Sequence, residues 1–116
     1  MNELSEVERQ VLCAALAGPL SWQQELREQV KHLEVLSRED TGAGVYTRFK
    51  LLKTGKLVDI PVEAYREPPQ VRATHPAIQG DIFFLVWLKA GAIDQLEMAS
   101  GHTPIPDQSA IRIIGP

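Results

Sequence analysis

The sequence predicts an α+β fold in which two N-terminal helices pack on one face of a mainly antiparallel β-sheet of about five or six strands. Apolar residues recur at helical spacing only before Leu33, so the helices come first. The rest of the chain alternates apolar and polar residues between turn signals, as strands do. The longest apolar run, Ile82 to Leu88, lies between Gly80 and Gly91 and is too short for a typical helix, which predicts a central strand.

Length and composition are typical of a single globular domain that spans residues 1–116. A hydrophobic share of 44% and a charged share of 23% remove the compositional support for disordered, collagen-like and membrane classes. The formal net charge of -3 argues against a protein that mainly grips phosphate backbones, so nucleic acid is a disfavoured partner.

Three features predict a cytoplasmic protein without a membrane anchor. The only cysteine, Cys13, cannot form an internal disulfide, and its apolar surroundings predict a small buried residue in a reducing compartment. No apolar stretch approaches the roughly 20 residues of a membrane span. Asn2, Glu3 and Glu6 occupy the positions where a secretory signal would carry positive charge.

The first helix is predicted to begin at Ser5. Ser5 and Glu8 have the spacing of a capping box, in which each side chain satisfies a backbone amide of the first turn; Asn2 is an alternative cap. An apolar stripe follows, and Gly18-Pro19 ends the helix. The stripe consists of Leu4, Val7, Val11, Leu12, Ala15 and Leu16.

A second helix is predicted from Ser21 to His32. Ser21 and Gln24 repeat the capping pattern, and apolar residues continue at helical spacing behind them. Because the connection is short, the two helices are neighbours. The sequence leaves open whether they form an angled pair or one sharply broken helix.

A hairpin is predicted next, from residues 35–40, a turn at 41–44 and residues 45–51. In the second strand four apolar or small residues alternate with Tyr46, Arg48 and Lys50, which indicates one face on the core and one in water. Residues 57–65 resemble a third strand with Pro61 inside it, so that strand belongs at an edge or carries a bulge.

Residues 66–79 contain three prolines and neither period, which predicts a long ordered loop of the kind that often carries function. The strand at 82–88 is followed by a turn at Ala90-Gly91 and a second strand that ends near Met98. We expect positive φ at Gly91 in a type I turn with a glycine bulge, because alanine resists the left-handed region that a type I′ turn requires. Residues 99–109 are polar and rich in turn residues, and a last strand is predicted at 110–114.

Side chains alternate along a strand, so Phe83, Leu85 and Trp87 point away from the face that Phe84 shares. An uncovered patch with phenylalanine and tryptophan is an aggregation liability. Either the loop at 66–79 or a second subunit must cover it, and a homodimer is the slightly favoured interpretation.

Candidate catalytic residues are His75 and His102 with Asp81 or Glu97. A histidine oriented by a carboxylate can act as an acid/base pair near neutral pH. Solvated loop histidines explain the same pattern. The three histidines, with His32, are too scattered for a zinc pattern and there is one cysteine, so the sequence predicts neither a metal nor another cofactor.

Candidate binding residues are Tyr46, Arg48 and Lys50 on one strand, and Phe83 and Trp87 on another. With Phe49 interleaved, the basic strand is compatible with single-stranded nucleic acid or an acidic protein. A solvated outer face explains it as well, since basic residues on an edge strand also deter strand addition.

Two separated stretches resemble a group of small uncharacterised bacterial proteins. Residues 38–49 read REDTGAGVYTRF, and residues 80–88 and 91–97 read GDIFFLVWL and GAIDQLE. The group pairs a TGxGxxTxF segment with a later apolar strand, a glycine turn and a strand containing Leu-Glu. The resemblance covers most of residues 38–106. It implies an α+β fold and no assigned activity, so no catalytic residue is carried over.

Three functions remain open. The first is a non-catalytic interaction module that binds itself or another bacterial protein through a strand edge or its loops. The second is a small hydrolase or isomerase that uses a His/carboxylate pair. The third is a sheet that binds single-stranded RNA around Tyr46, Arg48 and Lys50. Of these, the interaction module is the expectation.

Overall fold

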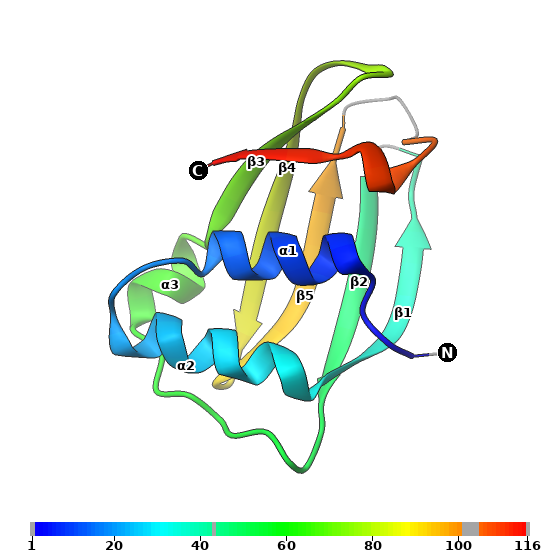
Figure 1. Ribbon diagram of the computed structural model, residues 1–116. Helices are drawn as coiled ribbons and strands as arrows, with labels where there is room; N and C mark the ends of the chain where they lie inside the picture. The colour runs from blue at the N-terminus through cyan, green and yellow to red at the C-terminus, as the bar shows by residue number, and fades with distance from the viewer. Residues whose placement is uncertain (1, 43, 101–104, 116) are drawn as a thin grey trace.

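The computed structural model describes residues 2–42, 44–100 and 105–115 (Figure 1). The helices and strands follow in the order α1 (Glu6–Ala15), α2 (Ser21–Gln29), the single-turn helix η1 (Val30–His32), β1 (Leu33–Asp40), β2 (Gly44–Leu51), α3 (Val62–Arg66), β3 (Gln70–His75), β4 (Ile78–Lys89), β5 (Ala92–Ala99), η2 (Gln108–Ala110) and β6 (Arg112–Gly115). The longest strand, β4, contains the apolar run that predicts a central strand.

The described strands form one six-stranded antiparallel sheet in the order β1-β2-β5-β4-β3-β6. β5 and β4 occupy its middle, and the β1-β2 and β4-β5 hairpins are joined because β2 pairs with β5. The predicted α+β class and antiparallel sheet are therefore confirmed. The last strand starts at Arg112 rather than Ala110 and pairs with β3.

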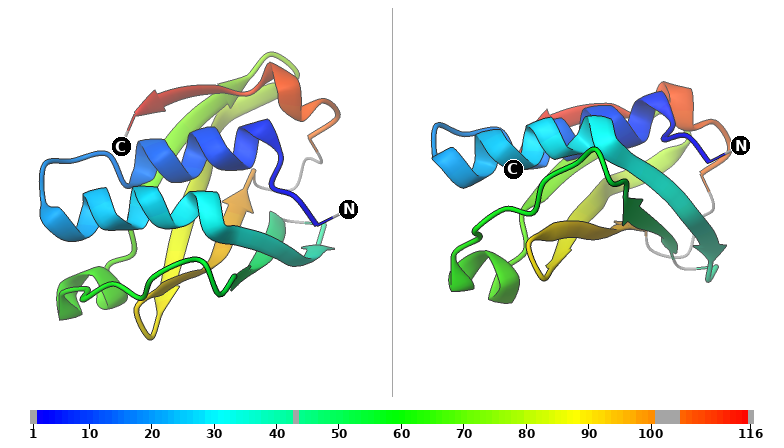
Figure 2. Two further views of the ribbon diagram at one scale, coloured as in Figure 1. Left: turned by 60° about the horizontal axis from the view of Figure 1, so that its bottom comes forward. Right: turned by 90° about the horizontal axis from the view of Figure 1, so that it is seen from below.

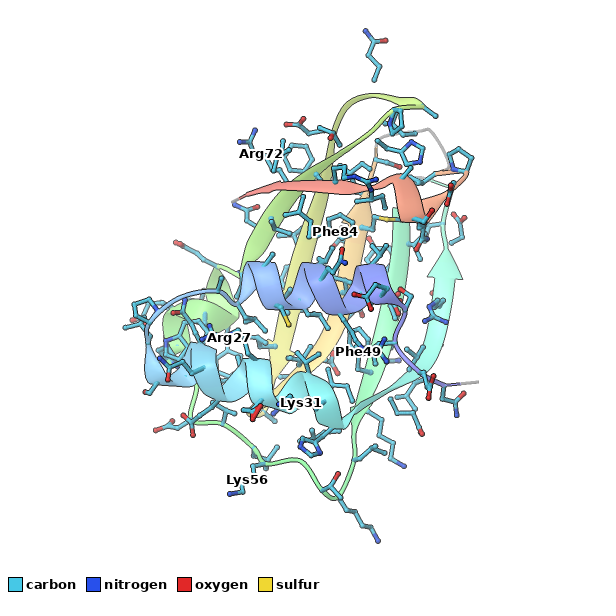
Figure 3. The ribbon with its side chains drawn as sticks, viewed as in Figure 1. Arg27, Lys31, Phe49, Lys56, Arg72 and Phe84 are labelled. Atoms are coloured by element: carbon cyan, nitrogen blue, oxygen red, sulfur yellow. The ribbon has the colours of Figure 1, made fainter. Side chains whose placement is uncertain are left out.

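Helices α1 and α2 are separate neighbours that run in opposite directions in front of the sheet (Figure 1). Seen from below, the sheet curves around this helix pair (Figure 2). α1 contacts β3, β4 and β6, and α2 contacts β5. Buried side chains from both helices and from the strands belong to one core, which includes Leu12, Leu26, Phe49, Phe84, Ile93 and Leu96. Figure 3 labels Phe49 and Phe84 among them.

The predicted capping box of α1 is confirmed. The Ser5 hydroxyl accepts a hydrogen bond from the Glu8 amide at 3.1 Å, and the Glu8 carboxylate accepts one from the Ser5 amide at 2.7 Å. At the other end of α1, Arg27 of α2 donates to the carbonyl oxygens of Leu16 and Gly18 at 2.6 and 3.0 Å. Backbone acceptors left free at the helix end thereby gain a cation as their donor.

Two sequence predictions about the helices are wrong. Leu20, not Ser21, precedes the first turn of α2, and the Gln23 side chain accepts from the Leu20 amide at 3.2 Å, so half of a capping box forms one residue earlier. Cys13 is exposed rather than buried. The buried stripe of α1 includes Val11 and Leu12, and the helical period turns the next residue away from it.

The region between the two hairpins also differs from the prediction. Within residues 57–65 the chain forms no strand; Pro61 instead precedes the short helix α3. Residues 66–79, predicted as a loop, form β3 and the start of β4. Val71, Ala73 and His75 are buried at alternate positions, a strand signal that the flanking prolines obscured. Pro76 lies in the turn between these strands.

The turn of the central hairpin has positive φ at both Ala90 (49°) and Gly91 (84°). Lys89 pairs with Ala92, so the loop has two residues, and this is the pattern of a type I′ turn rather than the predicted type I turn with a bulge. A Cβ on Gly91 would lie 2.9 Å from the carbonyl oxygen of Val58, because that segment packs directly on the turn. The segment around Val58 therefore leaves no room for a side chain at position 91, and Ala90 occupies a backbone region that alanine normally avoids.

Replacing Ala90 with asparagine should stabilise the protein by about 1 kcal/mol, because asparagine tolerates the left-handed region far better than alanine. Ala90 is exposed, so the new side chain has room. Urea unfolding measures the gain. Ala77→Asn is the matched control, since Ala77 is an exposed turn residue that lacks positive φ. Equal effects of the two substitutions would show that φ at residue 90 does not limit stability.

Candidate functional site

The two faces of the central strands differ in exposure. Along β4, Ile82, Phe84 and Val86 are buried toward the helices, whereas Phe83 and Trp87 keep 45% and 37% of their surface exposed. Helices α1 and α2 lie on one side of the sheet (Figure 2). Since side chains alternate along β4, Phe83 and Trp87 point to the other side. Two large aromatic side chains therefore face outward from the middle of the sheet, as the sequence predicts.

We call this outward surface of the four strands β2, β5, β4 and β3 the open face. The strand register places its members in rows across the sheet: Tyr46 pairs with Glu97 and Glu97 with Leu85, while Arg48 pairs with Gln95 and Gln95 with Trp87. Phe83 pairs with Arg72 of β3. The open face comprises Tyr46, Arg48, Arg72, Phe83, Leu85, Trp87, Gln95 and Glu97.

A carboxylate joins the two polar aromatic side chains of the open face. Glu97 accepts a hydrogen bond from the Tyr46 hydroxyl at 3.3 Å and another from the Trp87 indole nitrogen at 3.0 Å. The charge of Glu97, followed by partial desolvation and this hydrogen bond, raises the pKa of Tyr46 above its ordinary value; Glu39 adds to the effect. Both rings are therefore held in place by one carboxylate.

Charges of both signs lie on and beside the open face. Arg72 and Asp81 form an ion pair on neighbouring strands, with 3.1 Å between Nη1 and Oδ2. Lys50, also a predicted binding residue, is exposed further along β2. Phe49 is buried in the core instead, so it cannot stack on a base beside Tyr46. The open face thus combines apolar area with mixed charge rather than a uniform basic stripe.

His75 has a structural environment. It is buried, its Nδ1 accepts from the Ala77 amide at 3.0 Å, and its Nε2 lies 2.7 Å from the carbonyl oxygen of Asp107. Since Nδ1 is an acceptor, the proton belongs on Nε2, which donates to that carbonyl. Both nitrogens of the neutral ring are occupied in joining the β3-β4 turn to the segment before β6.

The described structure does not bring the predicted catalytic residues together. Asp81 pairs with Arg72, Glu97 binds the two aromatic side chains, and no hydrogen bond or ion pair within the described ranges joins either carboxylate to His75. His102 lies outside the described residues. Among the residues that the structure describes, no group of three or more His, Cys, Asp or Glu side chains could hold a metal ion.

Both edges of the sheet discourage pairing with another strand. The pairing register of β1 shifts between Val35 and Ser37. The second half of this strand is exposed and includes Arg38, Glu39 and Asp40. β6 has only four residues. Bulges, charges and short strands are the devices by which native sheets protect their edges. The open face is therefore better suited to binding than either edge.

The fold and the open face define a small α+β protein with one exposed, aromatic sheet surface. Comparison of the chain with protein-family models, with curated proteins and with solved structures finds no match. Among its described helices, none is long and apolar enough to cross a membrane.

Proposed function

We propose that this protein is a non-catalytic interaction module that binds another protein molecule through the open face, while α1 and α2 cover the inner face. The observation that carries the proposal is the pair of hydrogen bonds from Tyr46 and Trp87 to Glu97. Aromatic side chains with few remaining rotamers lose little entropy on binding, and tyrosine, tryptophan and arginine dominate the energetics of protein interfaces.

Protein is favoured over nucleic acid because of the charge distribution. Arg48 and Arg72 are the basic members of the open face, but Glu97 lies between the two rings and Asp81 already pairs with Arg72. Binding to phosphate backbones requires cations that release counterions, and nearby carboxylates oppose this. A mixed surface is instead complementary to another mixed surface.

The first partner to consider is a second copy of the chain. The sequence offered the segment 66–79 as an alternative cover for Phe83 and Trp87, but that segment is itself part of β3 and β4. Symmetric dimers are the commonest oligomers and use the same patch on both subunits, which would remove the aromatic patch from water.

Sedimentation across a concentration series tests this proposal. We expect a dimer in the wild type and a monomer in Phe83→Arg, because Phe83 is an exposed member of the open face and burying an added guanidinium in the interface would cost its desolvation. Leu57→Arg is the matched control, since Leu57 is 70% exposed in the segment between β2 and α3. It should leave the dimer intact.

A wild type that remains monomeric at every concentration would rule out self-association. A dimer that survives Phe83→Arg would place the interface elsewhere on the molecule. Salt-sensitive binding of mixed single-stranded oligonucleotides that depends on Tyr46 and Arg48 would replace the protein partner with RNA or DNA.

A further inference from the structure

Helix α3 lies at the same end of the molecule as the connection between α1 and α2 (Figures 1 and 2). Residues from these segments line a groove that is separate from the open face. Its volume is about 710 Å³, within the range of sites that bind ligands. We call it the α3 groove. Its apolar surface includes Leu20, Trp22 and Ala64, and carboxylates are supplied by Asp59, Glu63 and Glu67.

The apolar part of the α3 groove is unusually accessible for side chains of this size. Leu20 keeps 55% of its surface exposed. It precedes the first turn of α2, a position that polar residues normally occupy. Trp22 is only half-buried against the core. An aromatic face at such a position attracts cations as well as apolar groups.

The three carboxylates of the α3 groove have no hydrogen-bond or ion-pair partner among the described residues. Each of Asp59, Glu63 and Glu67 is exposed, and no lysine or arginine of the described chain lines the groove. Glu63 lies in α3, and Glu67 is the residue that follows the end of this helix, where its amide donates to the carbonyl oxygen of Glu63 at 2.8 Å. Within the described chain these side chains do not converge as metal ligands do.

We propose that the α3 groove binds a basic, partly apolar peptide segment of a partner protein. Basic side chains of the segment would pair with Glu63, Glu67 and Asp59, and an apolar side chain would rest on Leu20 and Trp22. Negative charge that is spread along an apolar groove matches several cations joined on one chain better than a single ion. This site and the open face can be occupied independently, since they share no residue.

Nuclear magnetic resonance with two peptides tests the proposal. The chain has two tryptophans, so its two indole N–H signals can be assigned with Trp22→Phe. An acetylated Arg-Leu-Arg-Leu-Arg peptide should shift the Trp22 signal and leave the Trp87 signal unchanged, whereas Glu-Leu-Glu-Leu-Glu should shift neither. Movement of the Trp87 signal alone would mean that basic peptides bind the open face, which overturns the proposal.

Charge substitutions provide the second measurement. Glu63→Gln with Glu67→Gln should weaken the basic peptide about fivefold to tenfold in fluorescence anisotropy, because two exposed ion pairs are lost. Glu25→Gln with Glu34→Gln removes the same charge outside the α3 groove and should have a much smaller effect. Equal weakening by both pairs would reveal non-specific attraction to a protein of net charge -3 and overturn the site.

The affinity of free arginine shows whether the α3 groove binds a peptide or a small cationic ligand. It should bind far more weakly than the peptide, because it presents one guanidinium and no apolar side chain. Binding of arginine as tight as that of the peptide would show that the α3 groove takes a small cation, contrary to the proposal.

Discussion

Gln29→Glu should be among the most destabilising isosteric changes that this chain can undergo at neutral pH. The Gln29 side chain is buried, and its Nε2 donates to the carbonyl oxygens of Lys56 and Gly91 at 2.9 and 3.1 Å. Its Oε1 accepts from the Ile93 amide at 2.8 Å. One side chain of α2 thus satisfies backbone groups of the central hairpin and of the segment between β2 and α3.

A glutamate at this position has no donor when ionised, so its second oxygen faces two carbonyl oxygens. We expect a loss of about 3 to 4 kcal/mol at pH 7, from two missing hydrogen bonds and a buried, unpaired charge. Burial and the carbonyl dipoles would raise the pKa of the new carboxyl group in the folded state. Stability should therefore recover partly as the pH falls, since the protonated acid donates one hydrogen bond again.

Urea unfolding at pH 5 and pH 7.5 measures both effects. Gln24→Glu is the matched control, because Gln24 lies on the exposed side of the same helix. It should change stability by less than about 0.5 kcal/mol. A small, pH-independent effect of Gln29→Glu would show that the segment around Lys56 relaxes away from the side chain.

The contrast between these two glutamines marks the limit of prediction from the sequence. Ser5 and Glu8 could be predicted as a capping box because both partners lie within one helical turn. Gln29 is an ordinary helix residue by sequence, and its partners are residues that lie far along the chain. Nothing local distinguishes it from Gln24, so its role depends on the tertiary packing of α2 against the hairpin.

The sequence predicts a strand and its two faces correctly where a long apolar run is present, as in β4. The outward direction of Trp87 and Phe83 is predicted correctly, because side chains alternate from the buried members of β4. β3 is not predicted from the sequence, because its buried positions hold no long apolar run. They are Val71, Ala73 and His75, and prolines stand on both sides of the strand. Local preference does not predict the type of the turn at Ala90, because alanine normally avoids the positive φ that this residue has.

The candidate binding residues were partly predictable. Tyr46 and Arg48 were assigned to one outward face by alternation, but their proximity to Trp87 required the pairing of β2 with β5. Those two strands are distant in sequence, and local patterns do not specify which hairpins adjoin. The sequence alone therefore groups Glu97 with the histidines as a catalytic candidate, whereas its contacts are with the two aromatic side chains.

A second large effect is expected at Glu8, which links α1 to the first hairpin. Its carboxylate accepts two hydrogen bonds from the Arg38 guanidinium, at 2.7 and 2.9 Å, and one from the Thr47 hydroxyl at 3.1 Å, besides the one from the Ser5 amide. Burial raises the pKa of Glu8, but the Arg38, Ser5 and Thr47 hydrogen bonds and the charge of Arg38 outweigh it, so the pKa lies below its ordinary value.

Because the folded-state pKa of Glu8 is depressed, its contribution to stability is present above the ordinary pKa of 4.5 and is lost as the pH falls through the lower folded value. Glu8→Gln should therefore cost about 2 kcal/mol at pH 7, which is less than for a fully buried pair because Arg38 is partly solvated. That corresponds to a melting temperature lower by about 8 °C. At pH 3 the difference from the wild type should be much smaller.

Glu6→Gln supplies the control for this pH dependence, since Glu6 is an exposed carboxylate of the same helical turn. Its unfolding free energy should differ from that of the wild type by less than about 0.5 kcal/mol. A gap between Glu8→Gln and the wild type that stays constant from pH 7 to pH 3 would mean that the ionised form of Glu8 is not what stabilises the fold. In that case the capping hydrogen bond to the Ser5 amide, which an amide oxygen can also accept, would be the main contribution of this residue.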